Sequence, residues 1–176
     1  KRGLAAELAT ALNVLQEIEA EDGPKGGVQN FYRGCTLAHY HQETREALRR
    51  LSDQLPTKIL WKQWDAALEM PYQGKPLWVH GDIAPGNILV RQHHFYGLLD
   101  FGILGTGDPA CDYAMAWTYF DRESRPVFLR GLPQDLIFRA RGWALWKALI
   151  TYQDSNPDFR DAARRTIEEL LSESEY

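Results

Sequence analysis

Apolar residues recur at steps of three and four along the first part of the chain, which is the spacing of one face of an α-helix. The first such run covers residues 4–18 and ends at a stretch rich in Gly and Pro. Two more helices are predicted over residues 41–55 and 57–70, where Pro56 separates them and Thr57 is placed to cap the second. The chain is therefore predicted to begin with helices.

The spacing of apolar residues then changes. Residues 76–80, 87–91 and 95–101 form short apolar runs of the kind typical of strands. The last two runs are separated only by polar residues, so they predict a hairpin with His93 and His94 in an exposed turn.

Helical spacing returns after a Gly-rich segment, with helices predicted over residues 110–120, 134–153 and 159–173. Asn156 and Asp158 stand where a cap for the last of them belongs. Tryptophans at helical spacings are predicted to be mainly core residues, namely Trp61, Trp64, Trp117, Trp143 and Trp146. The whole pattern predicts a mainly α fold with a small β-hairpin insert (α+β), in a single domain over residues 1–176.

Composition narrows the class of protein and its partners but does not identify a function. The 176 residues are 44% hydrophobic and 25% charged, which is ordinary for one globular domain. The net charge of −4 argues against a nucleic-acid partner and suits a cationic substrate. No apolar run approaches the ~20 residues of a membrane span, so no membrane partner and a cytoplasmic location are expected. Cys35 and Cys111 lack metal-ligand spacing and are expected to be reduced thiols.

The candidate chemistry lies in the β insert. His80, Asp82 and Asn87 have the spacing H-x-D-x-x-x-x-N, and Asp100 opens a D-F-G sequence farther along. Phosphoryl transfer needs a carboxylate that takes or orients a hydroxyl proton, and oxygen ligands for Mg²⁺ ions on the nucleotide phosphates. A single acid in a turn is ordinary loop chemistry, but this combination is far more restrictive.

The predicted strands explain how these side chains could meet. A loop leaving the first strand at His80 would project Asp82, and a tight turn at Pro85-Gly86 would direct Asn87 back toward it. The hairpin would then return Asp100 to the same end of the sheet.

Residues 78–90 (WVHGDIAPGNILV) and 97–117 (GLLDFGILGTGDPACDYAMAW) resemble the phosphotransferase family that includes the aminoglycoside phosphotransferases and has a protein-kinase-like fold. Residues 30–48 (NFYRGCTLAHYHQETREAL) resemble the segment that precedes the catalytic loop in that family. The resemblance covers most of residues 1–170 and is strongest across 78–118. It is specific for the family but not for a substrate.

The resemblance implies a role for each motif residue. Asp82 would be the catalytic base, and Asn87 and Asp100 would bind Mg²⁺ and, through it, ATP, with GTP not excluded as donor. His80 would support the catalytic loop by packing and hydrogen bonding. Asp112 would do so by accepting backbone N–H groups, although an acid at a helix N-terminus is also favoured by the helix dipole.

The same resemblance divides the chain into a catalytic loop and metal-binding hairpin, residues 78–102, and a helical substrate-side region, residues 112–172. One position departs from the family pattern. Relatives often carry His or another bulky residue two positions after the catalytic Asp, where this chain has Ala84, and this leaves one wall of the site smaller.

Two absences narrow the expectation. The short segment between Gly102 and Gly107 has no A-P-E sequence, so no protein-kinase activation segment fits and a small-molecule hydroxyl acceptor is expected. Residues 1–79 read as helices, and GPKGG at 23–27 matches neither common phosphate-binding glycine pattern. The chain also lacks an initial Met. It is therefore expected to be a C-terminal lobe without its N-terminal β lobe, inactive alone and prone to self-association through the uncovered face.

The leading hypothesis is the catalytic lobe of an ATP-dependent phosphotransferase acting on an aminoglycoside-like antibiotic, which would connect it to antibiotic resistance. Kinases of choline or amino alcohols, sugars or macrolides share these motifs, and a non-catalytic kinase-like binding lobe is a further alternative. A metal-dependent phosphoesterase fits poorly, because no D-x-H precedes the motif and Pro85 stands where a second acid is needed. No acceptor-binding residue is predicted, and four acids are expected on solvated faces rather than in an acidic cleft: Asp121, Glu123, Asp135 and Asp154.

Overall fold

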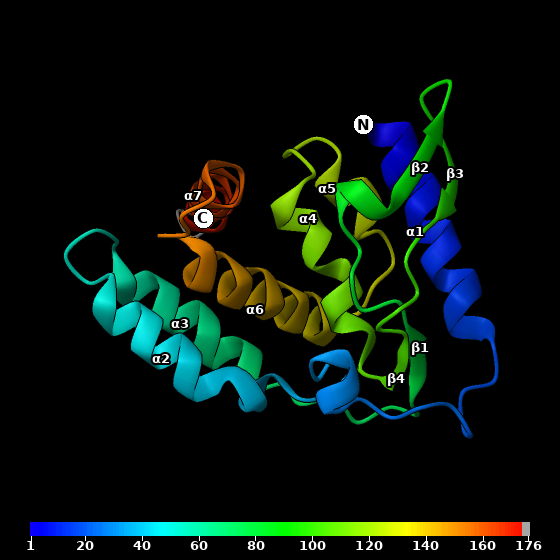
Figure 1. Ribbon diagram of the computed structural model, residues 1–176, viewed down its shortest axis with the longest axis horizontal. Coiled ribbons are helices and arrows are strands. Elements are labelled where there is room, and N and C mark those ends of the chain that lie inside the picture. Colours follow the sequence, from blue (N-terminus) through cyan, green and yellow to red (C-terminus); the bar gives the residue numbers. More distant parts are fainter. Residues whose placement is uncertain (174–176) are drawn as a thin grey trace.

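Most of the chain is helical, as the periodicity predicts. A computed structural model describes residues 1–173 (Figure 1). The helices are α1 (Arg2–Glu17), α2 (His41–Arg50), α3 (Thr57–Leu68), α4 (Met115–Thr118), α5 (Arg125–Phe128), α6 (Gln134–Thr151) and α7 (Pro157–Ser172). The strands are β1 (Leu77–Val79), β2 (Ile88–Arg91), β3 (His94–Leu98) and β4 (Gly105–Gly107).

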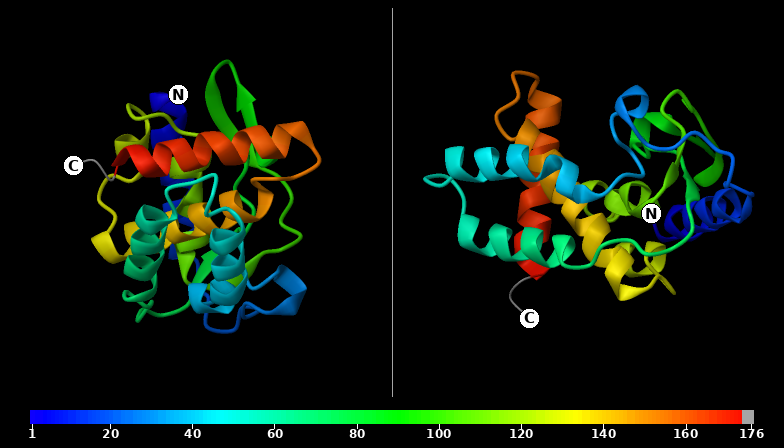
Figure 2. Two further views of the ribbon diagram at one scale, coloured as in Figure 1. Left: turned by 90° about the vertical axis from the view of Figure 1, so that its left-hand side faces the viewer. Right: turned by 90° about the horizontal axis from the view of Figure 1, so that it is seen from below.

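Helix α6 is the centre of the core. It contacts α2, α3, α4, α7 and the 3₁₀ segment Pro109–Ala114, and α7 runs across α2 and α3 (Figure 2, left). Its Gly142 permits close packing, because a Cβ there would lie 2.7 Å from Leu37 Cδ1 and 2.8 Å from Ala67 Cβ. A helix surrounded in this way buries side chains on all its faces.

The tryptophan prediction is confirmed. Trp64, Trp117, Trp143 and Trp146 are buried, and Trp61 is half-buried against the same core. Large aromatic side chains supply much of the apolar area that a core of this size removes from water.

The strands form two separate antiparallel pairs. As predicted, β2 and β3 form a hairpin. Strand β1 instead pairs with β4, in the Gly-rich stretch that carries no strand signal, with Leu77 opposite Gly107 and Val79 opposite Gly105. A Cβ on Gly107 would lie 2.0 Å from the carbonyl oxygen of Gly34, so glycine is required where this strand passes the N-terminal segment.

The hairpin turn contains Gln92 and His93, whose φ angles are 51° and 67°. Two positive φ angles are typical of the type I′ turn, whose twist matches that of the strands. His93 and His94 are both exposed as predicted, but His94 lies outside the turn. It begins β3 and contacts α1, with Nδ1 2.7 Å from Glu7 Oε1. Glu7 Oε2 also accepts the Phe95 N–H at 2.7 Å, so α1 supports the hairpin.

Two predicted helices are shorter than expected. Helix α2 ends at Arg50 rather than at residue 55, and residues 51–54 form turns. Pro56 disfavours helical dihedrals only in Leu55, directly before it. The helix predicted over 110–120 is a 3₁₀ turn, Pro109–Ala114, followed by the short α4. Helix α5 has no counterpart in the prediction.

The predicted caps have different outcomes. Thr57 is the first residue of α3 and not its cap, and the N-cap residue Pro56 accepts no side-chain bond because it has no polar side chain. Asn156 caps α7 as predicted, since its Oδ1 accepts the N–H of Asp158 at 3.0 Å.

Both cysteines are free thiols, also as predicted. Among the described residues, no helix is long and apolar enough to cross a bilayer.

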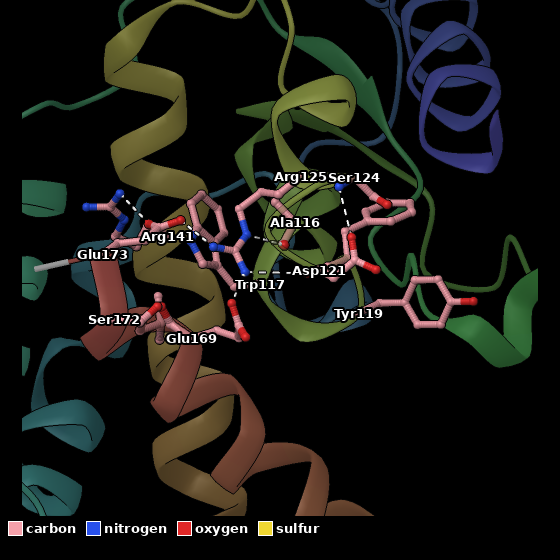
Figure 3. A network of polar contacts seen from close by, with 12 residues as sticks. Ala116, Trp117, Tyr119, Asp121, Ser124, Arg125, Arg141, Glu169, Ser172 and Glu173 are labelled. Atoms are coloured by element: carbon pink, nitrogen blue, oxygen red, sulfur yellow. Dashed lines mark hydrogen bonds and ion pairs between the residues drawn. The ribbon is translucent and has the colours of Figure 1, made fainter. Parts of the chain in front are cut away.

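A network of charged groups fastens the end of α7 to the core (Figure 3). The buried guanidinium of Arg125 pairs with Glu169 and Glu173 and donates to the Ala116 carbonyl at 2.8 Å. Glu173 also accepts from Trp117 Nε1 at 2.9 Å and from Arg141 at 2.7 Å. The network therefore joins α4, α5, α6 and α7.

Replacing Arg125 with Met keeps most of the side-chain volume but removes every ion pair and hydrogen bond of the guanidinium. We expect the free energy of unfolding to fall by about 2 kcal/mol, which is below the ~3–5 kcal/mol of a fully buried pair because both glutamates can be partly hydrated. Urea denaturation measures the change. Arg165→Met on the exposed face of α7 is the control, and an equal loss of stability in the two variants would contradict the assigned role of the network.

Candidate active site

The loop after β1 is fixed by a buried carboxylate. Asp112 is fully buried, and its two oxygens accept the N–H groups of His80 at 2.7 Å and Gly81 at 2.8 Å. Burial raises the pKa of Asp112 to about 6, although both N–H groups favour the ionised form. One side chain from the 3₁₀ segment thus satisfies two successive backbone donors that would otherwise be buried without partners.

His80 connects this loop to the end of the hairpin. The ring is buried, and its Nδ1 accepts the Asp82 N–H at 3.3 Å. Its Nε2 lies 2.9 Å from the carbonyl oxygen of Leu99. Since Nδ1 accepts, the ring proton belongs on Nε2, where it is donated to Leu99. The ring also packs on Phe101, with 4.7 Å between centroids. Asp82 and Asp100 are therefore supported by one side chain.

The structure brings Asp82 and Asn87 together. Residues Pro85–Asn87 form a 3₁₀ turn, and Asn87 Nδ2 donates to Asp82 Oδ2 at 2.8 Å and to the Asp82 carbonyl at 2.9 Å. Both bonds use the amide nitrogen, so the amide oxygen of Asn87 remains as a ligand atom.

Asp100 follows the hairpin in an unusual backbone conformation. Its φ is +60°, a left-handed value that is uncommon outside glycine, and its Oδ1 accepts the N–H of Gly102 at 3.2 Å. The preceding Leu99 N–H donates to the Asn87 carbonyl at 2.8 Å, which ties the two ends of the hairpin. Non-glycine residues with positive φ persist where surrounding contacts fix them, often at functional sites.

Asp82 and Asp100 line one open pocket of about 480 Å³. Its other walls come from residues 31–43, from α6 and from Ile103 after the D-F-G sequence, and they are formed by Phe31, Arg33, Tyr40, Glu43, Ile103, Trp146 and Lys147. Of these residues, only Trp146 belongs to a group in the sequence, the helical tryptophans, of which some members could line a substrate cleft although most are predicted to be core. The signal available was the resemblance of residues 30–48 to the family segment before the catalytic loop, which places a segment but assigns no side chain.

The four acids expected on solvated faces lie outside this pocket. Asp121 accepts the Ser124 N–H at 2.9 Å and lies 4.0 Å from Lys1 Nζ. Glu123 pairs with Arg2, and Asp135 pairs with Arg139. Asp154 accepts the backbone N–H of Asn156. The acidic groups of the pocket come instead from Glu43, Asp82 and Asp100.

The fold and these motifs agree with a comparison against protein families. The model of the phosphotransferase enzyme family matches residues 1–149, which is most of the chain. The chain belongs to this family. No curated protein sequence matches it significantly.

Solved structures with the same fold are distant relatives of this phosphotransferase-family chain. They include macrolide 2′-phosphotransferase MphH from Brachybacterium faecium, with a TM-score of 0.55, 20% identity, and coverage of 95% of this chain and 60% of that one. The gentamicin complex of APH(2″)-IIa gives a TM-score of 0.52 and 20% identity over 96% and 61% of the two chains. ADP-bound APH(2″)-Ib gives 0.50 and 19% over 98% and 64%.

The chain spans about 60% of the length of these structures. Its mostly helical architecture with small antiparallel sheets corresponds to the C-terminal lobe of the kinase-like fold, as predicted. The identities are low, so this likeness concerns the fold and not the substrate.

The donor atoms near Asp82 suit Mg²⁺ carried by a nucleotide. Asn87 and Asp100 offer oxygen ligands, which Mg²⁺ prefers, and Mg²⁺ usually keeps several waters and binds substrate phosphates. Within residues 1–173 no cluster of three or more His, Cys, Asp or Glu side chains is arranged to hold a metal ion. As two protein ligands, Asn87 and Asp100 would suit a metal whose coordination is completed by phosphates and water.

Asp112→Asn tests the support of the loop. The amide has the same shape, but it can accept only one of the two N–H groups and directs its own NH₂ at the other. We expect the free energy of unfolding to fall by about 2 kcal/mol, the cost of leaving a buried donor unsatisfied. Urea denaturation measures it, with Asp65→Asn on the exposed face of α3 as control. Unchanged stability of Asp112→Asn would contradict the assignment.

Proposed function

We propose that the chain is the catalytic lobe of an ATP-dependent phosphotransferase that transfers the γ-phosphate to a hydroxyl of a small molecule. The observation that carries the proposal is the convergence of three groups. Asn87 hydrogen-bonds the Asp82 carboxylate, and Asp82 and Asp100 open into the same pocket. The proposed base and the proposed metal ligands thus meet at one place, although they are distant in sequence.

In this mechanism Asp82 orients the acceptor hydroxyl and takes its proton. Asn87 holds Oδ2 of Asp82, which leaves Oδ1 to accept the hydroxyl hydrogen. Asn87 and Asp100 would hold Mg²⁺, which would supply neutralisation of the charge on the phosphate oxygens of the nucleotide. Because the chemistry needs little beyond positioning and charge stabilisation, the rigidity of the loop is part of the mechanism.

The pocket supports a polar acceptor, and the aminoglycoside type is the one we propose. Three carboxylates line it (Glu43, Asp82 and Asp100) beside two cationic groups, Arg33 and Lys147, and Phe31, Tyr40 and Trp146 add aromatic surfaces. Carboxylates and aromatic faces both attract ammonium groups. The solved structures of the fold include an aminoglycoside complex and a macrolide phosphotransferase. An acceptor screen should include amino alcohols and sugars beside aminoglycosides, because kinases of those compounds share these motifs. An aminoglycoside acceptor would make this a resistance enzyme.

The side chains of Asp82 and Asp100 are exposed, so their replacement should affect transfer and not folding. We expect Asp82→Asn and Asp100→Ala, made in the complete polypeptide that carries this chain, each to lower kcat about 10³-fold or more, because they remove the proton acceptor and a metal ligand. Coupled release of ADP in the presence of acceptor measures kcat. Asp65→Asn is the matched control and should keep full activity.

Near-normal turnover in either variant would exclude the proposed mechanism. Binding of acceptor or nucleotide without transfer in the parent protein would favour the non-catalytic binding lobe. Phosphate release from simple phosphoesters without nucleotide would favour the phosphoesterase.

Residues 1–176 alone should transfer little phosphate. The described residues contain no Gly-rich strand–turn–strand to cover nucleotide phosphates, which is the element that covers them in enzymes of the protein-kinase type. Exposed apolar side chains gather on the hairpin and the segment after it, namely Leu89, Val90, Tyr96, Leu99 and Phe101. We therefore also expect this chain to self-associate through that face. Nucleotide turnover and sedimentation velocity measure the two effects, and rapid turnover by a monomer would contradict both.

A further inference from the structure

Arg33 contacts the catalytic loop at a backbone group that Asp112 does not bind. Its Nε donates to the Gly81 carbonyl at 3.0 Å. Its guanidinium lies over the rings of Trp143 and Trp146, 5.2 and 5.1 Å from their centroids. Arg33 also lines the pocket that contains Asp82. Neither the motif residues nor the mechanism proposed above assigns it a role.

The segment that presents Arg33 is held in a costly conformation. Phe31 and Tyr32, directly before it, have φ angles of 51° and 55°. The buried Asn30 fixes this turn, since its Oδ1 accepts the Gly27 N–H at 2.9 Å and its Nδ2 donates to the Arg33 carbonyl at 3.0 Å. Two consecutive non-glycine residues at positive φ cost free energy and persist only when surrounding contacts require them.

The aromatic surface under Arg33 is also fixed. Trp146 Nε1 donates to Glu43 Oε2 at 2.6 Å, and Tyr40 stacks on Trp146 with 4.0 Å between centroids. The Tyr40 hydroxyl donates to the Phe31 carbonyl at 2.6 Å, which joins this surface to the strained turn. The guanidinium therefore rests on rings that are themselves held in place.

Gly81 is therefore bound through both its N–H and its C=O group. Its N–H is bound by the Asp112 carboxylate at 2.8 Å and its C=O by the Arg33 guanidinium at 3.0 Å. The φ of Gly81 is +87°, and a Cβ there would lie 2.9 Å from the Ile103 carbonyl oxygen and 3.2 Å from Arg33 Cβ. Charged groups of opposite sign thus fix the two peptide units that precede the Asp82 side chain.

We propose that Arg33 is a positioning residue that sets the direction of the Asp82 carboxylate toward the acceptor pocket. A fixed guanidinium suits the task because its planar donor group has a defined direction while its cation lies over the Trp143 and Trp146 rings. A lysine ammonium lacks this planar fork. The kinetic consequence of this proposal rests on the proposed phosphotransfer, whereas the restraint on the loop does not.

The kinetic test uses Arg33→Lys and Arg33→Gln in the complete polypeptide, with Arg45→Gln on the exposed face of α2 as control. We expect kcat to fall about 10- to 100-fold in both Arg33 variants, the range for a slightly misplaced catalytic group. The KM for nucleotide and the melting temperature should stay close to those of the parent. A general structural role would instead lower the melting temperature, and wild-type kcat in both variants would overturn the proposal.

Amide hydrogen exchange provides a readout that does not depend on turnover. Arg33→Gln should accelerate exchange at His80 and Gly81, whose N–H groups bind Asp112, without changing exchange in α6. Unchanged exchange at both amides would overturn the proposal. Faster exchange with normal kcat would also overturn it, since the restraint would then not position Asp82. If the parent protein transfers no phosphate, the proposed function fails and exchange alone decides the restraint.

Discussion

The active-site geometry depends on the carboxylate of Asp112. This side chain comes from the segment that leads into the helical core, and it binds two successive N–H groups of the loop before Asp82. A fully buried carboxylate is costly unless hydrogen bonds compensate for its lost hydration, so the loop and Asp112 are each stable only in the presence of the other. The buried pair of Asp108 and Arg139 fastens the start of the same segment to α6, with 2.7 Å between Asp108 Oδ2 and Arg139 Nε. The reactive loop thereby gains the rigidity of the core without being part of it.

The hairpin extends this rigid base to the proposed metal ligands. His80 contacts both the loop and the Leu99 carbonyl, and the Leu99 N–H binds the Asn87 carbonyl. Asp82, Asn87 and Asp100 are thus connected through the His80 ring and through backbone groups, in addition to the side-chain contact between Asn87 and Asp82. This arrangement keeps side-chain oxygens available for substrate and metal, which positioned catalytic groups require.

Much of the fold and the central motif could be predicted from sequence, because both are local. Helices α1, α3 and α7 follow apolar periodicity, whereas α6 is a long helix that is apolar on most of its faces. The spacing of His80, Asp82, Asn87 and Asp100 reflects a single strand–loop–hairpin unit. Strand β4 could not be predicted, since its Gly-Thr-Gly sequence has no strand pattern and pairs through backbone groups with a distant segment. The pocket walls at Arg33, Tyr40 and Glu43 were missed for a related reason. They meet α6 only through tertiary packing, which leaves no periodic trace in the sequence.

The two faces of the loop are supported by different parts of the molecule. Asp112 and His80 act from the core side and do not line the pocket, whereas residues 31–43 and α6 form the wall that an acceptor would touch. A substitution at Lys147 would therefore change this wall while the loop keeps its supports. Arg33 belongs to both sets, because it lines the pocket and also holds the Gly81 carbonyl. At this one position a protein adapting to a new acceptor could not change its selectivity and its speed independently.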